Sequence, residues 1–269
     1  MATRKSKHSR TEKADPTIAA GRLHDTIEDG YIFVFSDAHY WPGEATTAHR
    51  GMIALIKELK PKIVVCNGDA FDGASISRHP RIGWDSAPSV TEELEAVRVR
   101  LAEIEKAAKG ASLYWPIGNH DARFETYLAD KAPQFEGVAG FALKDHFPAW
   151  TPCMSVWING DLVIKHRLGG GANAASTNAR TSGKSMVTGH LHSLKVSPIT
   201  DYNGTRFGVD TGTLARPYGQ QFLYTEDNPV DWRAGFAVFK FIDGKMMWPQ
   251  VAVVREEGVM EYCGNIYKV

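Results

Sequence analysis

Three short apolar runs, separated by two stretches of helical spacing, constrain the fold of this chain most. The runs at residues 31–36, 62–67 and 112–117 have the length and the apolar character of strands buried in a sheet. Between them, residues 47–59 and 90–108 carry apolar side chains at steps of three and four, as amphipathic helices do. This order requires crossover connections, so it predicts a mostly parallel sheet with helices packed on it.

Local signals mark the ends of these helices and predict further strands. Pro61 stops the first helix, and Ser89 with Glu92 forms a capping-box pattern at the start of the second. Asp243 and Gly244 predict a turn between two late strands. The predicted strands of the second half, with hairpin-type spacing, are residues 161–166, 185–188, 206–210, 235–242 and 246–255. We therefore expect an α/β fold, a two-layer β-sandwich of mixed sheets flanked by helices.

The start of the chain differs from the rest. Residues 1–15 carry five lysines and arginines against two acids, with almost nothing apolar to bury. We therefore expect residues 1–27 to form a basic, mobile tail. Such an arm could tether nucleic acid, although a solvated tail is the simpler interpretation. Residues 28–269 show no break in composition, and we assign them to a single domain.

Charge and cysteine content exclude several classes of protein. The 31 basic and 31 acidic side chains cancel, so no overall field draws the chain to nucleic acid or to an anionic membrane. Three widely spaced cysteines fit the reducing cytoplasm better than a disulfide framework. No apolar stretch has the length of a membrane span or the position of a secretory signal. We expect a cytoplasmic protein without membrane contact.

Histidines, acids and one asparagine stand at the ends of five predicted strands. In chain order they are Asp37 and His39, then Asp69 and Asp72, then Asn119, His120 and Asp121, then His166, and finally His190 and His192. Ligands of open α/β sheets bind at the carboxyl ends of strands. These five strand ends therefore gather side chains that suit borderline divalent metals at one edge of the fold.

The spacing within these blocks supports a common site. Asp37 and His39 are two residues apart, which puts both side chains on the same side of an extended segment. Gly68, Gly118 and Gly189 each precede one of the candidate residues, where a tight turn must bring the backbone close to the site. His49, by contrast, lies inside the first predicted helix, and we expect it on the surface rather than at a metal.

In these residues the sequence resembles the calcineurin-like metallophosphoesterase superfamily. The family signature is Asp-x-His, Gly-Asp-x-x-Asp, Gly-Asn-His-Asp/Glu, a lone His and Gly-His-x-His, and all five blocks occur here in order. The resemblance implies one metal ion held by Asp37, His39, Asp69 and His192, and a second held by Asp69, Asn119, His166 and His190. It further implies that Asp72 and Asp121 orient other side chains without touching metal, and that His120 faces the substrate.

The chemistry of phosphoester hydrolysis agrees with these residue types. Two cations about 3.5 to 4 Å apart neutralise an anionic phosphoester and lower the pKa of a bridging water, so that hydroxide exists at neutral pH. Asp69 suits the bridging position because a carboxylate has two oxygens, and His120 can protonate the departing alkoxide as a general acid. Nitrogen and oxygen ligands without thiolate fit Mn, Fe, Zn, Ni or Co, and family habit favours Mn.

We expect the substrate to be a phosphodiester, a nucleotide or a nucleic acid, because the chain has no large insertion that would cap the site. The loop at residues 73–89 follows the second motif and carries, near Trp84, the candidate substrate-binding residues Arg78, His79 and Arg81. Cations beside an aromatic ring suit a phosphate and a base, although a solvated loop with a packing Trp explains the same residues equally well.

Arg167 is a further candidate for substrate binding. It follows His166, where family members often carry glycine, and this departure makes His166 the least secure of the implied ligands. The glycine-rich residues 168–183 come next and are either a flexible lid or a phosphate-binding loop.

The same residues are compatible with functions other than that of a phosphodiesterase. A phosphomonoesterase or a pyrophosphohydrolase acting on small molecules uses the same centre. A protein phosphatase is disfavoured, because that branch of the family carries Arg after the Gly-Asp-x-x-Asp block, where this chain has Gly73. A non-catalytic scaffold on the same fold is the third hypothesis, but relatives of that kind lose metal-ligating residues or the general acid. This chain keeps all seven implied ligands and His120, which favours an active hydrolase.

Overall fold

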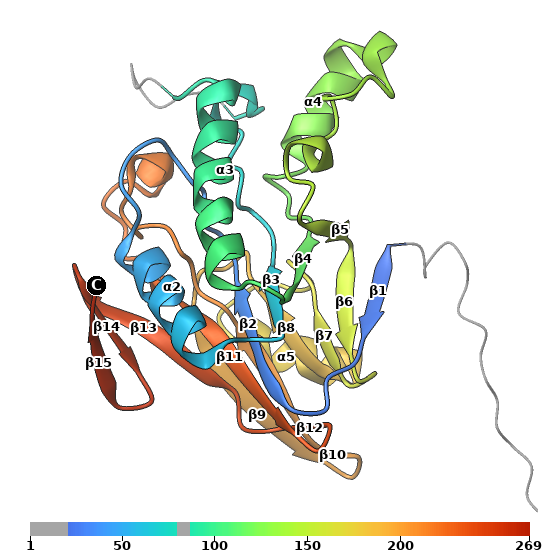
Figure 1. The fold of residues 1–269 in the computed structure, drawn as a ribbon, viewed down its shortest axis with the longest axis vertical. Coiled ribbons are helices and arrows are strands. Elements are labelled where there is room, and N and C mark those ends of the chain that lie inside the picture. The colour runs from blue at the N-terminus through green and yellow to red at the C-terminus, as the bar shows by residue number, and fades with distance from the viewer. Residues whose placement is uncertain (1–20, 80–86) are drawn as a thin grey trace, which may run out of the picture.

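A computed structural model describes residues 21–79 and 87–269, and its strands form two sheets (Figure 1). The larger sheet consists of β2 (Gly30–Phe35), β3 (Ile63–Cys66), β4 (Ser112–Pro116), β5 (Thr151–Cys153), β11 (Gly235–Ile242), β12 (Lys245–Met246), β13 (Gln250–Glu256), β14 (Val259–Tyr262) and β15 (Asn265–Lys268). The smaller sheet consists of β1 (Arg22–Asp25), β6 (Ser155–Ile158), β7 (Leu162–Ile164), β8 (Ser185–Thr188), β9 (Lys195–Asp201) and β10 (Gly204–Asp210).

Both sheets are mixed. In the larger one the order is β15-β14-β13-β11-β2-β3-β4-β5, with β12 paired to β11. The strands from β2 to β5 run parallel, as the crossover pattern predicts, and β11 lies antiparallel to β2. The smaller sheet has the order β1-β6-β7-β8-β10-β9, in which β7, β8 and β10 are parallel.

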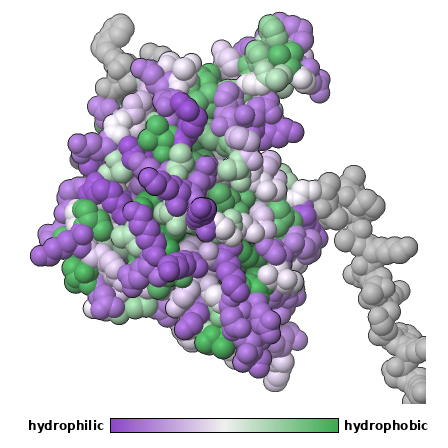
Figure 2. Space-filling view, viewed as in Figure 1, coloured by the Kyte–Doolittle hydropathy of each residue, from purple (hydrophilic) through white to green (hydrophobic). Residues whose placement is uncertain are grey.

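The helices are α2 (Thr47–Leu59), α3 (Val90–Ala107), α4 (Arg123–Lys131) and α5 (Ala174–Ser182), and the short 3-10 turns are η1 (Ala74–Ile76), η2 (Pro133–Phe135), η3 (Leu143–His146) and η4 (Gln220–Thr225). Both predicted helices are confirmed, and Ser89 and Glu92 form the expected capping box. Helices α2 and α3 lie side by side on the larger sheet, whereas α4 projects from one end (Figure 1). Figure 2 shows that its tip is apolar, and the exposed side chains Tyr127, Phe135 and Val138 belong to this region.

Strand β2 shows how the layers are held together. Phe33 and Phe35 belong to the apolar cluster under α2 and α3, whereas Ile32 and Val34 belong to the cluster between the two sheets. Because successive side chains of a strand point to opposite faces, a strand that is apolar throughout must be covered on both sides. The predicted fold class, two mixed sheets flanked by helices, is confirmed.

Two expectations about local structure are corrected. Residues 22–25 fall in the predicted tail, yet they form β1 and pair with β6 in parallel, while residues 1–20 lie outside the described part of the chain. Within the glycine-rich stretch, residues 174–182 form α5 rather than a lid or a phosphate loop. This helix packs closely on β10, because Gly208 leaves room for the carbonyl of Ala175.

The structure also bears on the expectations about cysteines and membrane contact. All three cysteines are free, but Cys263 is exposed, so the interpretation of the thiols as core residues holds only for Cys66 and Cys153. Among the described residues, no helix combines the length and the apolar character needed to cross a bilayer.

Candidate metal centre

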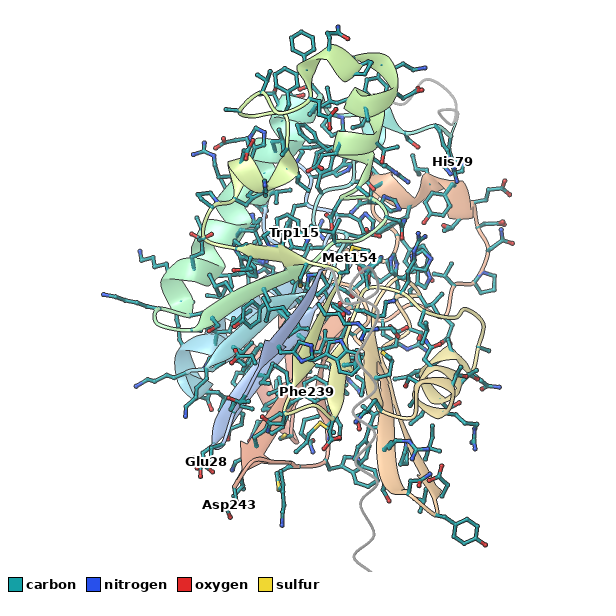
Figure 3. All side chains as sticks on the ribbon, turned by 90° about the vertical axis from the view of Figure 1, so that its right-hand side faces the viewer. Glu28, His79, Trp115, Met154, Phe239 and Asp243 are labelled. Atoms are coloured by element: carbon teal, nitrogen blue, oxygen red, sulfur yellow. The ribbon has the colours of Figure 1, made fainter. Side chains whose placement is uncertain are left out.

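The five sequence motifs meet at one edge of the sandwich. They follow the carboxyl ends of β2, β3 and β4 in the larger sheet and of β7 and β8 in the smaller one. The amide of Asp37 donates to the carbonyl of Gly68 (2.9 Å), and the amide of His190 donates to Oδ2 of Asp37 (2.8 Å), so both sheets contribute to one site. In Figure 3, Glu28 and Asp243 mark the opposite end of the strands, far from His79.

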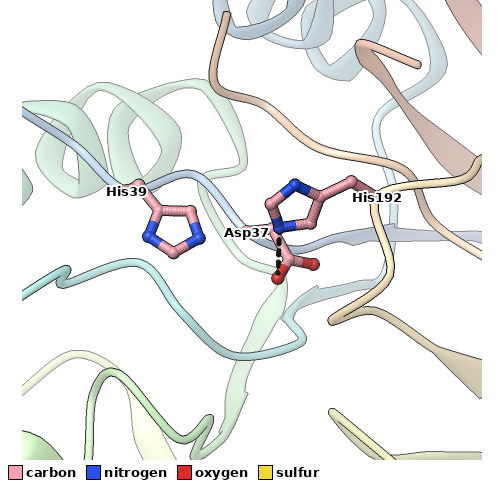
Figure 4. A group of neighbouring side chains, drawn as sticks. All are labelled: Asp37, His39 and His192. Carbon is pink, nitrogen blue, oxygen red and sulfur yellow. Dashed lines mark ion pairs between the residues drawn. The ribbon is translucent and has the colours of Figure 1, made fainter. Parts of the chain in front are cut away.

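Three overlapping groups of side chains each bring their ligand atoms within 4.8 Å of one another. These groups are Asp37 with His39 and His192, Asp69 with His166 and His190, and His39 with Asp69 and His120. Figure 4 shows the first group, in which Asp37 and His192 approach from different loops. The first two groups correspond to the two implied metal positions, and the third connects them through Asp69.

Buried atoms without partners support metal binding at these positions. Among the described residues, predicted ligands with such an atom are Asp37 (Oδ1), His39 (Nε2), Asn119 (Oδ1), His166 (Nε2) and His192 (Nδ1). Burying a polar atom without a hydrogen bond is costly, and native structures rarely leave several together. Two of these atoms lie at ion-pair distance from a neighbour without hydrogen-bond geometry: Nε2 of His166 is 3.0 Å from Oδ2 of Asp69, and Oδ1 of Asp37 is 3.2 Å from Nε2 of His192 (Figure 4). The residues therefore fit a group of divalent cations, which would coordinate the free lone pairs.

The backbone of the site is unusual as well. Five of the seven predicted ligands have positive φ angles: Asp37 (53°), His39 (39°), Asp69 (55°), His190 (71°) and His192 (59°). Non-glycine residues adopt this conformation at a cost, and it persists only where the surrounding structure enforces it. The loops thus hold these side chains in a strained arrangement, and the expectation that Asp37 and His39 lie on an extended segment is wrong, because both have left-handed backbone conformations.

The three motif glycines have the role that the sequence predicts. A Cβ atom at Gly68 would overlap the ring of His166, and one at Gly118 would overlap the carboxylate of Asp69. At Gly189 it would collide with Ser36 and Asp37. Glycine is therefore required for the close approach of the strand-end loops.

Two carboxylates hold the site in place. Asp72 accepts hydrogen bonds through Oδ1 from Nδ1 of His39 (2.9 Å) and Nδ1 of His120 (2.7 Å), which leaves Nε2 of His39 without a partner and Nε2 of His120 in contact with Arg123. Asp121 accepts from the backbone amides of Asp69, Phe71 and Gly118 and from the indole of Trp115, at 2.8 to 3.0 Å. Asp72 therefore orients histidine side chains directly, whereas Asp121 fixes the backbone of the two loops that carry Asp69 and Asn119.

A sequence comparison now identifies the family. A family model described as calcineurin-like phosphoesterase matches residues 30–194, more than half of the chain and all seven predicted ligands. The chain belongs to the calcineurin-like phosphoesterase family. It is accordingly a metal-dependent hydrolase that acts on phosphoester bonds. No curated protein shows a significant match to the sequence.

Solved structures with a similar arrangement are distant from this phosphoesterase. Vps29 from Entamoeba histolytica, complexed with zinc, is 13% identical over 86% of this chain and 96% of its own, with a TM-score of 0.45. The E. coli phosphoesterase Yfce is 17% identical over 81% of this chain and 97% of its own, with a TM-score of 0.36. A dimetal phosphatase from Danio rerio is 10% identical over 90% of this chain and 98% of its own, with a TM-score of 0.44.

Acidic and histidine side chains within the centre of the phosphoesterase shift one another's pKa values. Burial alone would raise the pKa of Asp69, but His166 lowers it by its charge and by contact. Burial would lower the pKa of His166, and Asp69 and Asp37 instead raise it to about 10. A cation at Nε2 of His166 must therefore displace a proton. The pKa of His120 is also raised, because Asp72 and Asp69 outweigh the effect of burial. This raised pKa suits a proton donor.

Two polar residues of the site, Arg123 and Glu93, were not predicted from the sequence. The guanidinium of Arg123 donates to the carbonyl of Asp72 (2.9 Å) and, through Nη2, to Nε2 of His120 (3.2 Å). Glu93 of α3 is fully buried and accepts from the amides of Gly73 (2.6 Å) and Ala74 (2.9 Å), so it anchors the loop after Asp72. Burial and the charge of Asp72 raise the pKa of Glu93 to about 7. An acid on the apolar face of a helix is the signal that could have revealed it.

The candidate substrate residues are placed less decisively. Arg78 and His79 are exposed, and no hydrogen bond or ion pair links their side chains to another described residue. Arg81 lies outside the described residues. Arg167 is exposed and directly follows the predicted ligand His166.

Proposed function

We propose that this phosphoesterase hydrolyses phosphodiesters of nucleotides or nucleic acid at a dinuclear metal centre, with Mn as the preferred metal. The observation that carries the proposal is the set of buried, unpartnered ligand atoms on Asp37, His39, Asn119, His166 and His192. We further propose a cytoplasmic location, since all three cysteines are unpaired.

Each cation would have its own set of ligands. Asp37, His39, Asp69 and His192 would hold one, and Asp69, Asn119, His166 and His190 would hold the other. When bound, such a pair of cations neutralises phosphate oxygens and makes water more acidic. Asp69 is suited to contact both, because it belongs to two of the ligand groups and its charge is shielded from solvent by nearly complete burial.

The protein side chains supply proton transfer and positioning. Asp72 accepts the Nδ1 proton of His120, and Nε2 accepts from Nη2 of Arg123, so His120 carries the second proton of an imidazolium at Nε2 once Arg123 turns to the substrate. As water attacks phosphorus and the bond to the leaving oxygen breaks, His120 gives this Nε2 proton to the departing oxygen. Arg123 lies 3.2 Å from the same nitrogen, so its guanidinium is placed to donate to a phosphate oxygen that enters beside His120.

A substrate panel tests this function. Protein stripped with a chelator is reloaded with Mn, Zn, Fe, Ni or Co and tested on bis-p-nitrophenyl phosphate, p-nitrophenyl phosphate, cyclic nucleotides and single-stranded DNA. We expect the diesters to be cleaved faster than the monoester, with two metal ions bound per chain. A faster reaction on the monoester, with no action on nucleotides or DNA, would favour a phosphomonoesterase. Absence of turnover with every metal would favour a scaffold.

A further inference from the structure

Three aromatic side chains outside the sequence motifs line the same centre. Phe222 and Tyr224 belong to η4, and Trp232 lies in the loop that leads into β11. We call these three residues the aromatic wall. The ring of Trp232 is centred 4.5 Å from that of His192, and the ring of Phe222 is centred 5.2 Å from that of His39. The wall therefore begins at the side chains predicted to bind metal.

The three rings form a continuous surface. Phe222 lies 5.0 Å from Trp232 and 6.3 Å from Tyr224, and Tyr224 lies 6.5 Å from Trp232, measured between ring centres. Phe222 is only 2% exposed, whereas Tyr224 is 57% exposed and Trp232 is half-buried. Phe222 thus supports the wall from inside, and the other two rings offer faces to a bound molecule.

The backbone fixes the wall relative to the metal ligands. The amide of Arg233 donates to the carbonyl of His192 (2.8 Å), and the amide of Thr213 donates to the carbonyl of Arg233 (3.1 Å). Trp232 is therefore attached through its neighbour to the strand-end loop of the last motif. Since a stacking surface must be rigid to select its ligand, this attachment suits a specificity element.

Tyr224 forms the exposed end of the wall. Its ring packs edge-on against that of Phe222, and the ring of Phe222 in turn contacts those of His39 and His192. A phosphate bound at these histidines would have its ester groups close to the exposed rings of Tyr224 and Trp232.

We infer that Trp232 and Tyr224 stack against a nucleobase of the substrate and thereby determine which phosphodiesters are hydrolysed. This inference rests on the proposed phosphodiesterase function and narrows its substrate class. Flat, exposed rings bind flat ligands with little sequence preference, because every base has a π-face. Removal of one such ring typically weakens binding by about 5-fold to 150-fold.

Two diesters with the same leaving group test the inference. The p-nitrophenyl ester of thymidine 5′-phosphate carries a base, and methyl p-nitrophenyl phosphate does not. We expect wild type to favour the thymidine ester in kcat/KM by about 10-fold or more. Trp232→Leu and Tyr224→Leu should each reduce this preference, the ratio of the two kcat/KM values, by about 10-fold, mainly through KM for the thymidine ester. Trp232→Phe, which keeps a ring, should retain most of the preference.

Matched controls separate stacking from a structural role. Trp248 and Tyr202 are exposed and lie on other parts of the surface, so Trp248→Leu and Tyr202→Leu should leave both esters unaffected. Equal losses on the two esters, or no change with either ester, would overturn the inference and leave the proposed function standing. If wild type loaded with metal hydrolyses neither ester, both the proposed function and the inference fail.

Discussion

His166 and His49 are both buried histidines, but their surroundings differ in one decisive respect. On helix α2, Nε2 of His49 donates to Glu103 (2.8 Å) and Nδ1 accepts from the hydroxyl of Tyr40 (2.9 Å), so both nitrogens are paired. At the strand ends, Nδ1 of His166 donates to the carbonyl of Asn67 (2.8 Å), and Nε2 has no hydrogen bond. Burial therefore does not distinguish the predicted metal ligand from the other histidine, whereas a nitrogen that faces a carboxylate without a hydrogen bond does.

The two histidines also titrate in opposite directions. Burial lowers the pKa of His49 to about 4, since the partly exposed Glu103 offsets the loss of solvation only in part. At His166 the buried charges of Asp69 and Asp37 outweigh burial and raise the pKa to about 10. His49 is thus kept as a neutral imidazole. Around His166, the charges of Asp69 and Asp37 favour a cation, either the imidazolium itself or a metal ion that replaces its proton. Four substitutions, with effects on rate from about a thousandfold to none, test this contrast.

The largest effect is expected at Asp69, the carboxylate common to both proposed metal positions. Asp69→Asn keeps the shape of the side chain but removes its charge. We expect both ions to fall well below one per chain and kcat/KM to drop on the order of a thousandfold, as several kcal/mol of charge stabilisation are lost. Metal analysis and diester hydrolysis measure this. Asp161→Asn, at an exposed turn, is the control, and full metal content in Asp69→Asn would contradict the assignment.

His166→Asn tests the second metal position alone. The variant should lose one of the two ions while the position formed by Asp37, His39 and His192 remains filled. A rate loss of about 100-fold is expected, because one of two cations no longer stabilises the transition state. Metal content is measured together with kcat at saturating Mn. Retention of two ions would show that the unpaired Nε2 of His166 is not a ligand.

His120→Asn tests the proton donor without disturbing either metal position. A p-nitrophenolate leaves without protonation, whereas an alkoxide does not. We expect about a 100-fold loss on a dinucleotide and only a few-fold loss on the p-nitrophenyl ester of thymidine 5′-phosphate. Both ions should stay bound. Equal losses on the two substrates would reject a general-acid role for His120.

Much of the metal centre is predictable from sequence, for a physical reason. Parallel strands present their carboxyl ends at one edge, so short motifs such as Asp37 to His39 converge whatever the details of packing. The glycines add to this, since Gly68 and Gly118 are required by contacts that span the motifs. Local spacing and topology together predict that the candidate ligands gather at one edge, and the structure brings six of the seven within reach of a neighbour: Asp37, His39, Asp69, His166, His190 and His192.

The rest depends on contacts that no local pattern encodes. Strand β1 exists only through its pairing with β6, and its four residues resemble the charged tail before them. Phe222 and Trp232 show no periodicity, and they reach the centre through a bond from Arg233 to His192. His49 was expected on the surface, which is wrong, because Tyr40 and Glu103 satisfy both of its nitrogens inside the protein. Tertiary partners decide each of these cases.

The smallest effect on rate is expected for His49→Gln. Metal content and kcat at pH 7.5 should match wild type, because His49 holds no free ligand atom. Its stability effect depends on pH: the unfolded imidazole takes up a proton below pH 6.5, whereas the folded one stays neutral to about pH 4. Wild type thus loses about 2.5 kcal/mol of unfolding free energy from this group between pH 7 and pH 4.5. The cost of His49→Gln, measured by urea unfolding, should therefore shrink by that amount over the same interval. A cost independent of pH would mean that His49 takes up its proton at the same pH in the folded and the unfolded protein, and the contrast with His166 would then fail.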